Sequence, residues 1–201
     1  MNINGHTHGN IAQPHPGRTF PQAIQLVLAE NRHVLEKIDH ASVESLAKAI
    51  LEAERIFVAG EGRSGLAIRM VAMRLMHLGR QVHVVGETTT PSLRKGDLFL
   101  VCSGSGKTGT VAILTTTAKN AGAMVVAITA EHGSPVASAA HLVVRIEAAA
   151  KQDLSGIYSK QFAGSLFEQA ALLLFDAMFH VLSRRLEKDP RTLWRQHANA
   201  E

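Results

Sequence analysis

The chain has 201 residues, of which 46% are hydrophobic and 19% are charged, as expected for a single globular domain with a sizeable core. The formal net charge is only +4, the basic residues are scattered along the chain, and 4% of residues are aromatic. These values argue against a nucleic-acid partner, which would need a basic arm or aromatic stacking platforms. A small anionic ligand explains the positive balance better.

Cysteine content and apolar runs indicate the compartment. Cys102 is the single cysteine, so the chain has no internal disulfide, which fits a reducing cytosol. Residues 1–9 lack the apolar core of a signal peptide, and the longest apolar stretch, Ala170–Phe175, is too short to span a bilayer. We therefore expect a soluble, cytoplasmic protein with no membrane partner.

The N-terminal part divides into a polar segment and two helices. Residues 1–18 are rich in Gly, Pro and His and are expected to be disordered, whereas residues 19–201 are expected to form one domain. Thr19 can cap a helix that has Pro21 in its first turn, and a second helix is predicted to start near Ser42.

Apolar runs and helical segments alternate through the middle of the chain. Five runs are predicted to be strands, namely residues 55–59, 81–85, 97–102, 124–129 and 142–146. Helices are expected over residues 65–78 and 108–121, and Gly79 and Gly122 are placed to end them. The central runs are continuously apolar, which is typical of parallel strands covered on both faces. Helical crossovers between such strands predict an α/β fold with a doubly wound, five-stranded parallel sheet.

Two helical segments are expected to contribute apolar side chains to the core. A final helix over about Ser165–Leu186 is apolar nearly all round, and we expect it to contribute both to the core and to a subunit interface. Met70, Met73 and Met76 recur at helical spacing and are expected to lie in the core.

Two loops rich in glycine and hydroxyl groups follow predicted strands. One is Gly60–Gly65 and the other is Ser103–Thr108, and each stands where a strand ends and a helix begins. A helix N-terminus has free N–H groups and the positive end of the helix dipole, so it attracts anions. Two such loops in one small domain predict a pocket for a phosphorylated ligand, at the carboxyl ends of the strands near the switch point of the sheet.

Each loop also resembles a different nucleotide-binding motif. Gly60-x-Gly62-x-x-Gly65 matches the dinucleotide fingerprint, and Glu87 lies at about the expected distance beyond it. Two features count against a dinucleotide site. The loop contains the side chains Arg63 and Ser64, which can bind an anion, and a second loop of the phosphate-binding type follows two strands later. Gly106-Lys107-Thr108 imitates the end of a triphosphate-binding loop, but the first glycine of that motif would fall at Val101, so the motif is absent.

Three further patterns have structural explanations. Ser165-x-x-Glu168 is favoured as a capping box, with Ser165 as N-cap and Glu168 reaching back to its N–H. Cys102 borders the second loop and is expected to be a small buried thiol. His6 and His8 could bind a metal, but in a polar terminus without a carboxylate or thiol cluster we expect them to be solvated.

The motifs are similar to those of the sugar isomerase (SIS) domain, and more narrowly to those of the 6-phospho-3-hexuloisomerase family. The resemblance covers nearly everything beyond residue 20. It rests on the following strings: Ile56–Gly65 with Met73–Gly79, Val85–Ser92, Ser103–Thr108, Gly164–Glu168 and His197–Asn199.

This resemblance implies a flavodoxin-like SIS fold and a metal-independent isomerase. The reaction would interconvert D-arabino-hex-3-ulose 6-phosphate and fructose 6-phosphate through a cis-enediolate, in the ribulose monophosphate pathway of formaldehyde assimilation. The resemblance implies no metal, no organic cofactor and a homotetramer. It also assigns the role of general base and acid to Glu168, in competition with the capping box.

The remaining site residues follow from the two loops and the tail. Ser103, Ser105 and Thr108, with the N–H groups of the loop that contains Gly104 and Gly106, are expected to hold the 6-phosphate. Arg63 and Ser64 would position the sugar hydroxyls or the carbonyl end. Lys107 either contacts phosphate or faces water. His197 either crosses to a neighbouring subunit to move protons between O2 and O3, or lies in a solvated tail.

Two other functions stay open at this point. SIS domains also serve as ligand-binding halves of regulators, so a non-catalytic phosphosugar-binding module is the main alternative. No helix-turn-helix or basic DNA-reading segment precedes residue 55, and a sensor would not need Glu168. A nicotinamide-dependent dehydrogenase is the third possibility.

Overall fold

The computed structural model describes residues 19–148 and 156–199, so the expected disorder of residues 1–18 lies outside the described residues. Five parallel strands form one sheet in the order β2-β1-β3-β4-β5, which confirms the predicted fold class. The strands are β1 (Ile56–Ala59), β2 (Val82–Val84), β3 (Leu98–Cys102), β4 (Met124–Thr129) and β5 (Leu142–Arg145). The chain order reverses direction between β1 and β3, which is the switch point of the sheet.

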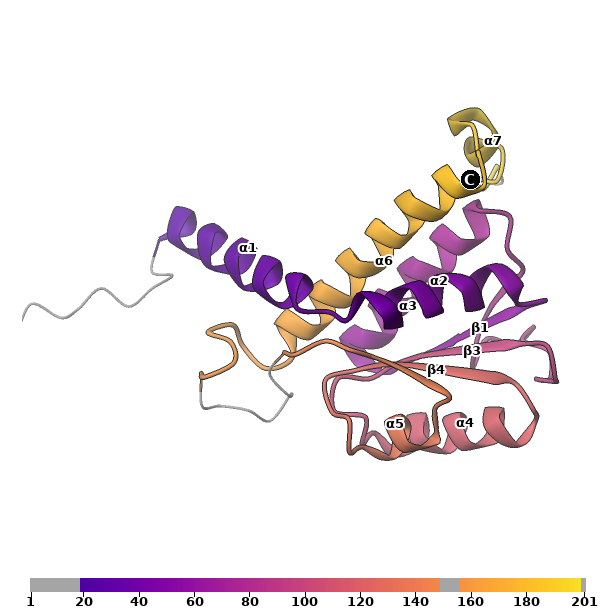
Figure 1. Cartoon of the computed structure of the whole chain (residues 1–201), viewed down its shortest axis with the longest axis horizontal. Coiled ribbons are helices and arrows are strands. Elements are labelled where there is room, and N and C mark those ends of the chain that lie inside the picture. The colour runs from indigo at the N-terminus through magenta and orange to yellow at the C-terminus, as the bar shows by residue number, and fades with distance from the viewer. Residues whose placement is uncertain (1–18, 149–155, 200–201) are drawn as a thin grey trace, which may run out of the picture.

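Helices cover both faces of the sheet (Figure 1). Helices α2 (His40–Glu52), α3 (Gly62–His77) and α6 (Ser165–Arg185) lie over one face. Helices α4 (Gly109–Asn120) and α5 (Pro135–Ala139) lie over the other. Alternate residues of each central strand enter the two cores, so Ile56 and Val58 face α3 and α6 whereas Phe57 and Ala59 face α4. This double burial explains the continuous apolar runs.

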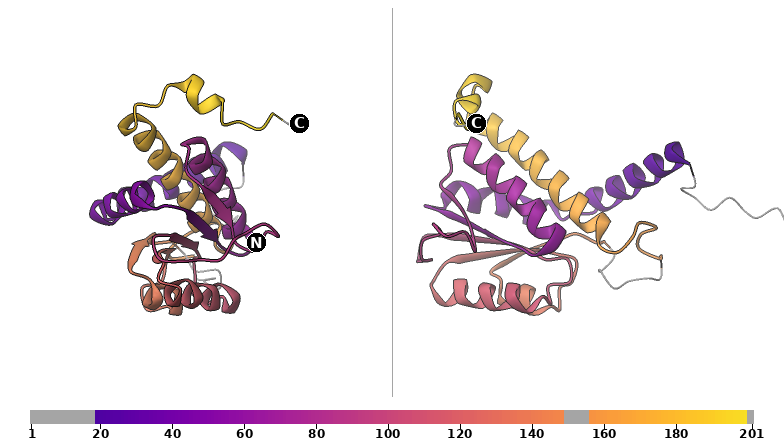
Figure 2. Two further views of the ribbon diagram at one scale, coloured as in Figure 1. Left: turned by 90° about the vertical axis from the view of Figure 1, so that its right-hand side faces the viewer. Right: turned by 180° about the vertical axis from the view of Figure 1, so that it is seen from behind.

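The first and last helices extend the fold at its margins. Helix α1 (Phe20–Glu36) begins after the predicted cap Thr19 and packs against α6 through its C-terminal half, while its N-terminal half projects away from the sheet (Figure 2). The short helix α7 (Pro190–Trp194) lies near the C-terminal end of α6.

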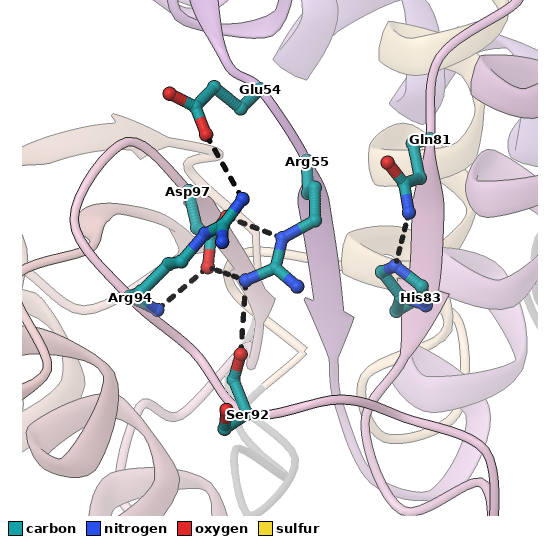
Figure 3. Close-up of polar contacts among 7 residues, drawn as sticks. All are labelled: Glu54, Arg55, Gln81, His83, Ser92, Arg94 and Asp97. Atoms are coloured by element: carbon teal, nitrogen blue, oxygen red, sulfur yellow. Dashed lines mark hydrogen bonds and ion pairs between the residues drawn. The ribbon is translucent and has the colours of Figure 1, made fainter.

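One connection differs from the expected helical crossovers. Between β2 and β3 the chain contains no helix. An ion pair holds this connection at the start of β3, because the Arg55 guanidinium donates two hydrogen bonds to Asp97 and a third to the Ser92 carbonyl (Figure 3). The Arg94 N–H also donates to Asp97 at 2.7 Å. These bonds tie the connection to the starts of β1 and β3.

The Asp97 carboxylate is ionised more easily than usual. Burial alone would raise its pKa, but hydrogen bonds from Arg55 and from the Arg94 N–H, with the charges of both guanidinium groups, outweigh it and lower the pKa.

Helix α3 begins earlier than predicted, at Gly62 rather than near residue 65. The predicted loop Gly60–Gly65 is therefore mostly the first turn of this helix. A Cβ on Gly65 would lie 2.6 Å from the Gly60 carbonyl oxygen, so only glycine lets the helix approach the end of β1 so closely. The glycines allow close packing here, and the dinucleotide pattern has this structural explanation.

The expectation that Met70 and Met73 lie in the core is wrong, because each is 49% exposed. Together with Leu66 they form an apolar stripe along α3, which we call the α3 stripe. The spacing correctly placed them on one face of a helix. The sheet is covered instead by the opposite side of α3, through residues such as Ile68 and Leu75.

Candidate active site

A cavity of about 100 Å³ opens at the carboxyl ends of β1 and β3, as predicted from the switch point. Three segments far apart in sequence line it: the start of α3, the loop between β3 and α4, and the start of α6 (Figure 1). The lining residues are Glu61, Ser64, Cys102, Ser103, Gly104, Ser105, Thr108, Gly164, Phe167 and Glu168. Six of the ten predicted site residues are therefore brought together.

The loop Ser103–Thr108 presents donors to this cavity. Thr108 is the N-cap of α4. Within the described residues, no hydrogen bond is found for the N–H groups of Gly104, Ser105 and Thr108. Unpaired N–H groups and hydroxyls before a helix form the kind of nest that binds an anion.

Glu168 supplies a carboxylate to the same cavity. The residue is only 6% exposed and stands in the first turn of α6, with the ring of Phe167 beside it on the helix. Its carboxylate accepts a hydrogen bond from the Nε of Arg63, which comes from the first turn of α3. A buried carboxylate whose one ion-pair partner among the described residues is a largely exposed arginine could take part in proton transfer once that arginine is displaced.

The capping box predicted at Ser165 does not form. Gly164 is the N-cap of α6, and the Ser165 N–H donates to the carbonyl of Phe162 rather than to the Glu168 side chain. The Glu168 carboxylate instead points to Arg63. The competing structural explanation of Glu168 is therefore wrong.

A second cavity of about 210 Å³ adjoins the first at Glu168. It lies along the junction of α3 and α6 and is lined by Arg63, Leu66, Met70 and Gln169, among others. Arg63 borders this second cavity and not the first. The Arg63–Glu168 pair therefore stands between the two cavities.

Cys102 is buried at the end of β3, as expected. Burial, with the negative charge of Glu168 nearby, raises the pKa of its thiol to about 12. The thiol is thus held neutral against the cavity wall and has no nucleophilic character at physiological pH.

Besides Arg63, three predicted residues do not line the first cavity. Lys107 is exposed, and its N–H donates to the Ser105 hydroxyl. Gly106 is buried behind the loop against Ser134. His197 stacks on His77, with 4.4 Å between the ring centroids, at the C-terminal end of α3. At 1.5 Å per residue, the helix separates this end from Arg63 by about 21 Å.

The environment of His77 explains how the tail is seated. His77 is buried, and this burial, with the charges of His197 and Arg74, lowers its pKa, so the ring is uncharged at neutral pH. An uncharged ring is the better surface for stacking against His197.

Four lining residues were not predicted as site residues, namely Glu61, Cys102, Gly164 and Phe167, and of these Glu61 has the charged side chain. Glu61 is the N-cap of α3 and stands between Gly60 and Gly62, just after the end of β1. That position was the available signal, since residues immediately after such a strand face the ligand edge.

The described residues contain no cluster of three or more His, Cys, Asp or Glu side chains that could hold a metal ion. His6 and His8 lie outside that part of the chain.

Helix α6 is long and apolar enough to cross a membrane, but half of its most apolar 18-residue stretch is buried inside the fold. That burial is typical of a core helix and does not indicate a membrane protein.

Comparison with known proteins identifies the family. The SIS domain model matches residues 49–173. A Mycobacterium gastri protein named 3-hexulose-6-phosphate isomerase is 48% identical over 185 residues, which cover 92% of this chain and 93% of that protein. A Bacillus subtilis (strain 168) protein of the same name is 39% identical over 176 residues, covering 87% of this chain and 95% of that protein.

A solved structure supports the same assignment. A Methanococcus jannaschii protein, for which a function of 3-hexulose-6-phosphate isomerase was inferred from the crystal structure, is 34% identical and has a TM-score of 0.78. The match covers 90% of this chain and 99% of that one. The chain belongs to the SIS domain family.

Proposed function

We propose that this protein is a 3-hexulose-6-phosphate isomerase, also called 6-phospho-3-hexuloisomerase. It interconverts D-arabino-hex-3-ulose 6-phosphate and fructose 6-phosphate, in the assimilation of formaldehyde. One observation carries the proposal: the buried carboxylate of Glu168 faces the same cavity as the anion-binding loop Ser103–Thr108. The relatives that bear this name align over nearly the whole chain, which supports the same assignment.

The phosphate group of the substrate is assigned to the Ser103–Thr108 loop. Ser103, Ser105 and Thr108 line the cavity, and the N–H groups of Gly104 and Ser105 are unpaired within the described residues. These donors, with the dipole of α4, would bind the dianion. Lys107 is exposed and is not lining the cavity, which favours water over phosphate as its neighbour.

The isomerisation needs one base that serves C2 and C3 in turn. Glu168 would take the proton from C2 while the C3 carbonyl becomes an enolate oxygen, which yields a cis-enediolate. The same carboxyl group would then return the proton to C3 as the carbonyl forms at C2. A proton must also pass from O2 to O3. The sum is an internal rearrangement that consumes no cofactor, and we propose none.

Arg63 and Ser64 are assigned to the sugar. We infer that the substrate draws Arg63 away from Glu168, which frees the base and places the guanidinium near the oxygens of the enediolate. The arginine side chain is 62% exposed while the glutamate side chain is 7% exposed, so the arginine is the partner with room to move.

Association of copies is part of the proposal. The α3 stripe, Leu66, Met70 and Met73, is apolar, exposed and adjacent to the second cavity, so a second copy would bury it and close that side of the site. We propose a homo-oligomer, a tetramer by the family resemblance, in which His197 of one copy reaches the site of another and moves the proton between O2 and O3.

We further propose that residues 19–201 form one domain and that the protein is cytoplasmic.

A coupled assay tests the proposed reaction. Formaldehyde, ribulose 5-phosphate and a separate hexulose-phosphate synthase supply the substrate, and fructose 6-phosphate is detected only when the isomerase acts. Fructose 6-phosphate formation that depends on this protein supports the proposal. Binding of fructose 6-phosphate without any isomerisation would instead indicate the phosphosugar-binding module.

A further inference from the structure

The connection between β4 and α5 holds the Ser103–Thr108 loop from behind. The Gly104 carbonyl accepts a hydrogen bond from the Ala130 N–H at 3.0 Å and another from the Thr129 hydroxyl at 3.2 Å. The Gly106 carbonyl accepts one from the Val136 N–H at 3.2 Å. Two carbonyl groups of the loop are thus held by residues that do not line the cavity.

Fixing these carbonyls also fixes the donors of the loop. In a planar trans peptide the carbonyl of one residue and the N–H of the next point in opposite directions. Because the Gly104 carbonyl is tied to the β4–α5 connection, the Ser105 N–H is directed the other way, to the side where Ser105 lines the cavity. The orientation of an anion-binding N–H therefore depends on groups that do not line the cavity themselves.

Two buried hydroxyls complete this support. Thr129 is fully buried, and its hydroxyl donates to the Gly104 carbonyl while it accepts from the Glu131 N–H at 3.2 Å. Ser134 is also fully buried, caps α5 by accepting from the Ala137 N–H, and donates to the Glu131 carbonyl.

Gly106 shows how closely the loop is seated on this support. Its φ is +58°, and a Cβ there would lie 2.0 Å from the Ser134 hydroxyl oxygen. The backbone of the loop is therefore in direct contact with Ser134, and only glycine permits that contact.

We propose that Thr129 and Ser134 are positioning residues for phosphate binding, which hold the N–H groups of the Ser103–Thr108 loop in the geometry that a phosphate ester requires. The inference rests on the proposed function. Because the phosphate is remote from the reacting carbons, we infer that it is bound equally in the ground state and the transition state. Loss of its positioning should therefore raise KM and leave kcat unchanged.

The test compares three threonine variants in the coupled assay. Thr129→Val keeps the shape of the side chain and removes the hydroxyl that donates to the Gly104 carbonyl. Loss of one hydrogen bond costs about 1 kcal/mol, so KM should rise about fivefold. The kcat should stay within about twofold of wild type. Thr129→Ser keeps the hydroxyl and should restore KM. Thr115→Val is the control, because Thr115 is equally buried but its hydroxyl bonds only to the Val111 carbonyl within α4.

Titration of the ¹⁵N-labelled protein with inorganic phosphate gives a readout that does not need catalysis. The amide signals of Ser105 and Thr108 should shift in wild type, and a fivefold higher phosphate concentration should be needed in Thr129→Val. If wild type binds phosphate but isomerises nothing, the proposed function fails while the positioning role is still measured.

Several results would overturn the inference. One such result is an unchanged KM and an unchanged phosphate affinity in Thr129→Val. Another is a loss of stability that Thr129→Val and Thr115→Val share, without weaker phosphate binding in Thr129→Val. Should Thr129→Val fail to fold, Ser134→Ala is titrated instead. Weaker phosphate binding in that variant supports the inference, and wild-type affinity overturns it.

Discussion

The Arg63 guanidinium donates a hydrogen bond to the buried Glu168 carboxylate and so joins the first turn of α3 to the first turn of α6. The pair is 105 residues apart in sequence. It stands between the cavity lined by the Ser103–Thr108 loop and the second cavity along the two helices. The carboxylate that we propose as the base is thereby placed within one site together with the only cation that contacts it among the described residues.

Replacement of the proposed base should remove catalysis without unfolding the protein. We expect Glu168→Gln to lower kcat about 10³-fold, because general acid–base catalysis contributes roughly 10² to 10⁴ and an amide cannot take the proton. The fold should persist, since Arg63 is largely solvated. Glu44→Gln is a matched control, because Glu44 also pairs with an arginine but does so on the surface, at α6 residue Arg185. Turnover near the wild-type rate in Glu168→Gln would refute the assignment.

The proposed role of His197 can be separated from its stacking. His197→Phe keeps an aromatic ring against His77 but removes the titratable nitrogens. If His197 moves protons in the site of another copy, kcat should fall about 10- to 100-fold while the melting temperature is unchanged. Removal of residues 195–201 should have a similar effect on kcat. An unaltered rate in both variants would show that the tail plays no part in catalysis.

The α3 stripe should hold copies together. Met70→Lys places a charge in the middle of the stripe, so we expect light scattering after size-exclusion chromatography to report a smaller particle than wild type. Ile113→Lys is the control, because Ile113 is 68% exposed on α4, on the opposite face of the sheet. An interface along α3 would be contradicted if both substitutions dissociated the oligomer to the same extent, or if neither did.

Cys102 should resist alkylation in the folded protein. Its thiol is buried and its pKa is raised to about 12, so almost no thiolate is present at pH 8. Iodoacetamide should leave the native protein unlabelled by mass spectrometry and should label it fully in urea. Any label must be on Cys102, since the chain has 1 cysteine. Rapid labelling of the native protein would show that the end of β3 is open.

The Arg55–Asp97 pair should contribute to stability in a pH-dependent way. Asp97→Asn leaves Arg55 without its charge partner, and we expect a loss of about 3 kcal/mol in the free energy of unfolding at pH 7. The pKa of Asp97 is lowered in the folded state from its ordinary value of 3.8. Wild type should therefore have the full stabilisation at pH values above 3.8 and lose it as the pH falls below that value towards the folded-state pKa.

Urea unfolding of both proteins at pH 7 and pH 3 measures this effect. The difference between wild type and Asp97→Asn should shrink at the lower pH. Glu54→Gln is the neighbouring control (Figure 3). Glu54 pairs with Arg94 in an exposed position, so its loss should cost less than about 1 kcal/mol. A pH-independent difference would contradict the ionised pair.

Local patterns were sufficient for the sheet and for the second loop. The strands are buried on both faces, so their apolar runs are continuous and visible without any tertiary information. The Ser103–Thr108 loop is also local, because a strand, the loop and its helix follow one another in the chain. The role of Glu168 was different: spacing favoured a capping box, and only the family resemblance indicated a base.

The amino-acid sequence by itself determined the parallel α/β fold and the glycine- and hydroxyl-rich loop at the edge of the sheet, because both depend on neighbouring residues. Only the tertiary structure decided which side of α3 would be covered, which leaves Met70 and Met73 on the surface. It also brought Arg63 to Glu168 and Thr129 behind Gly104. These contacts depend on which helices and turns pack together, and periodicity within one segment carries no information about its partner.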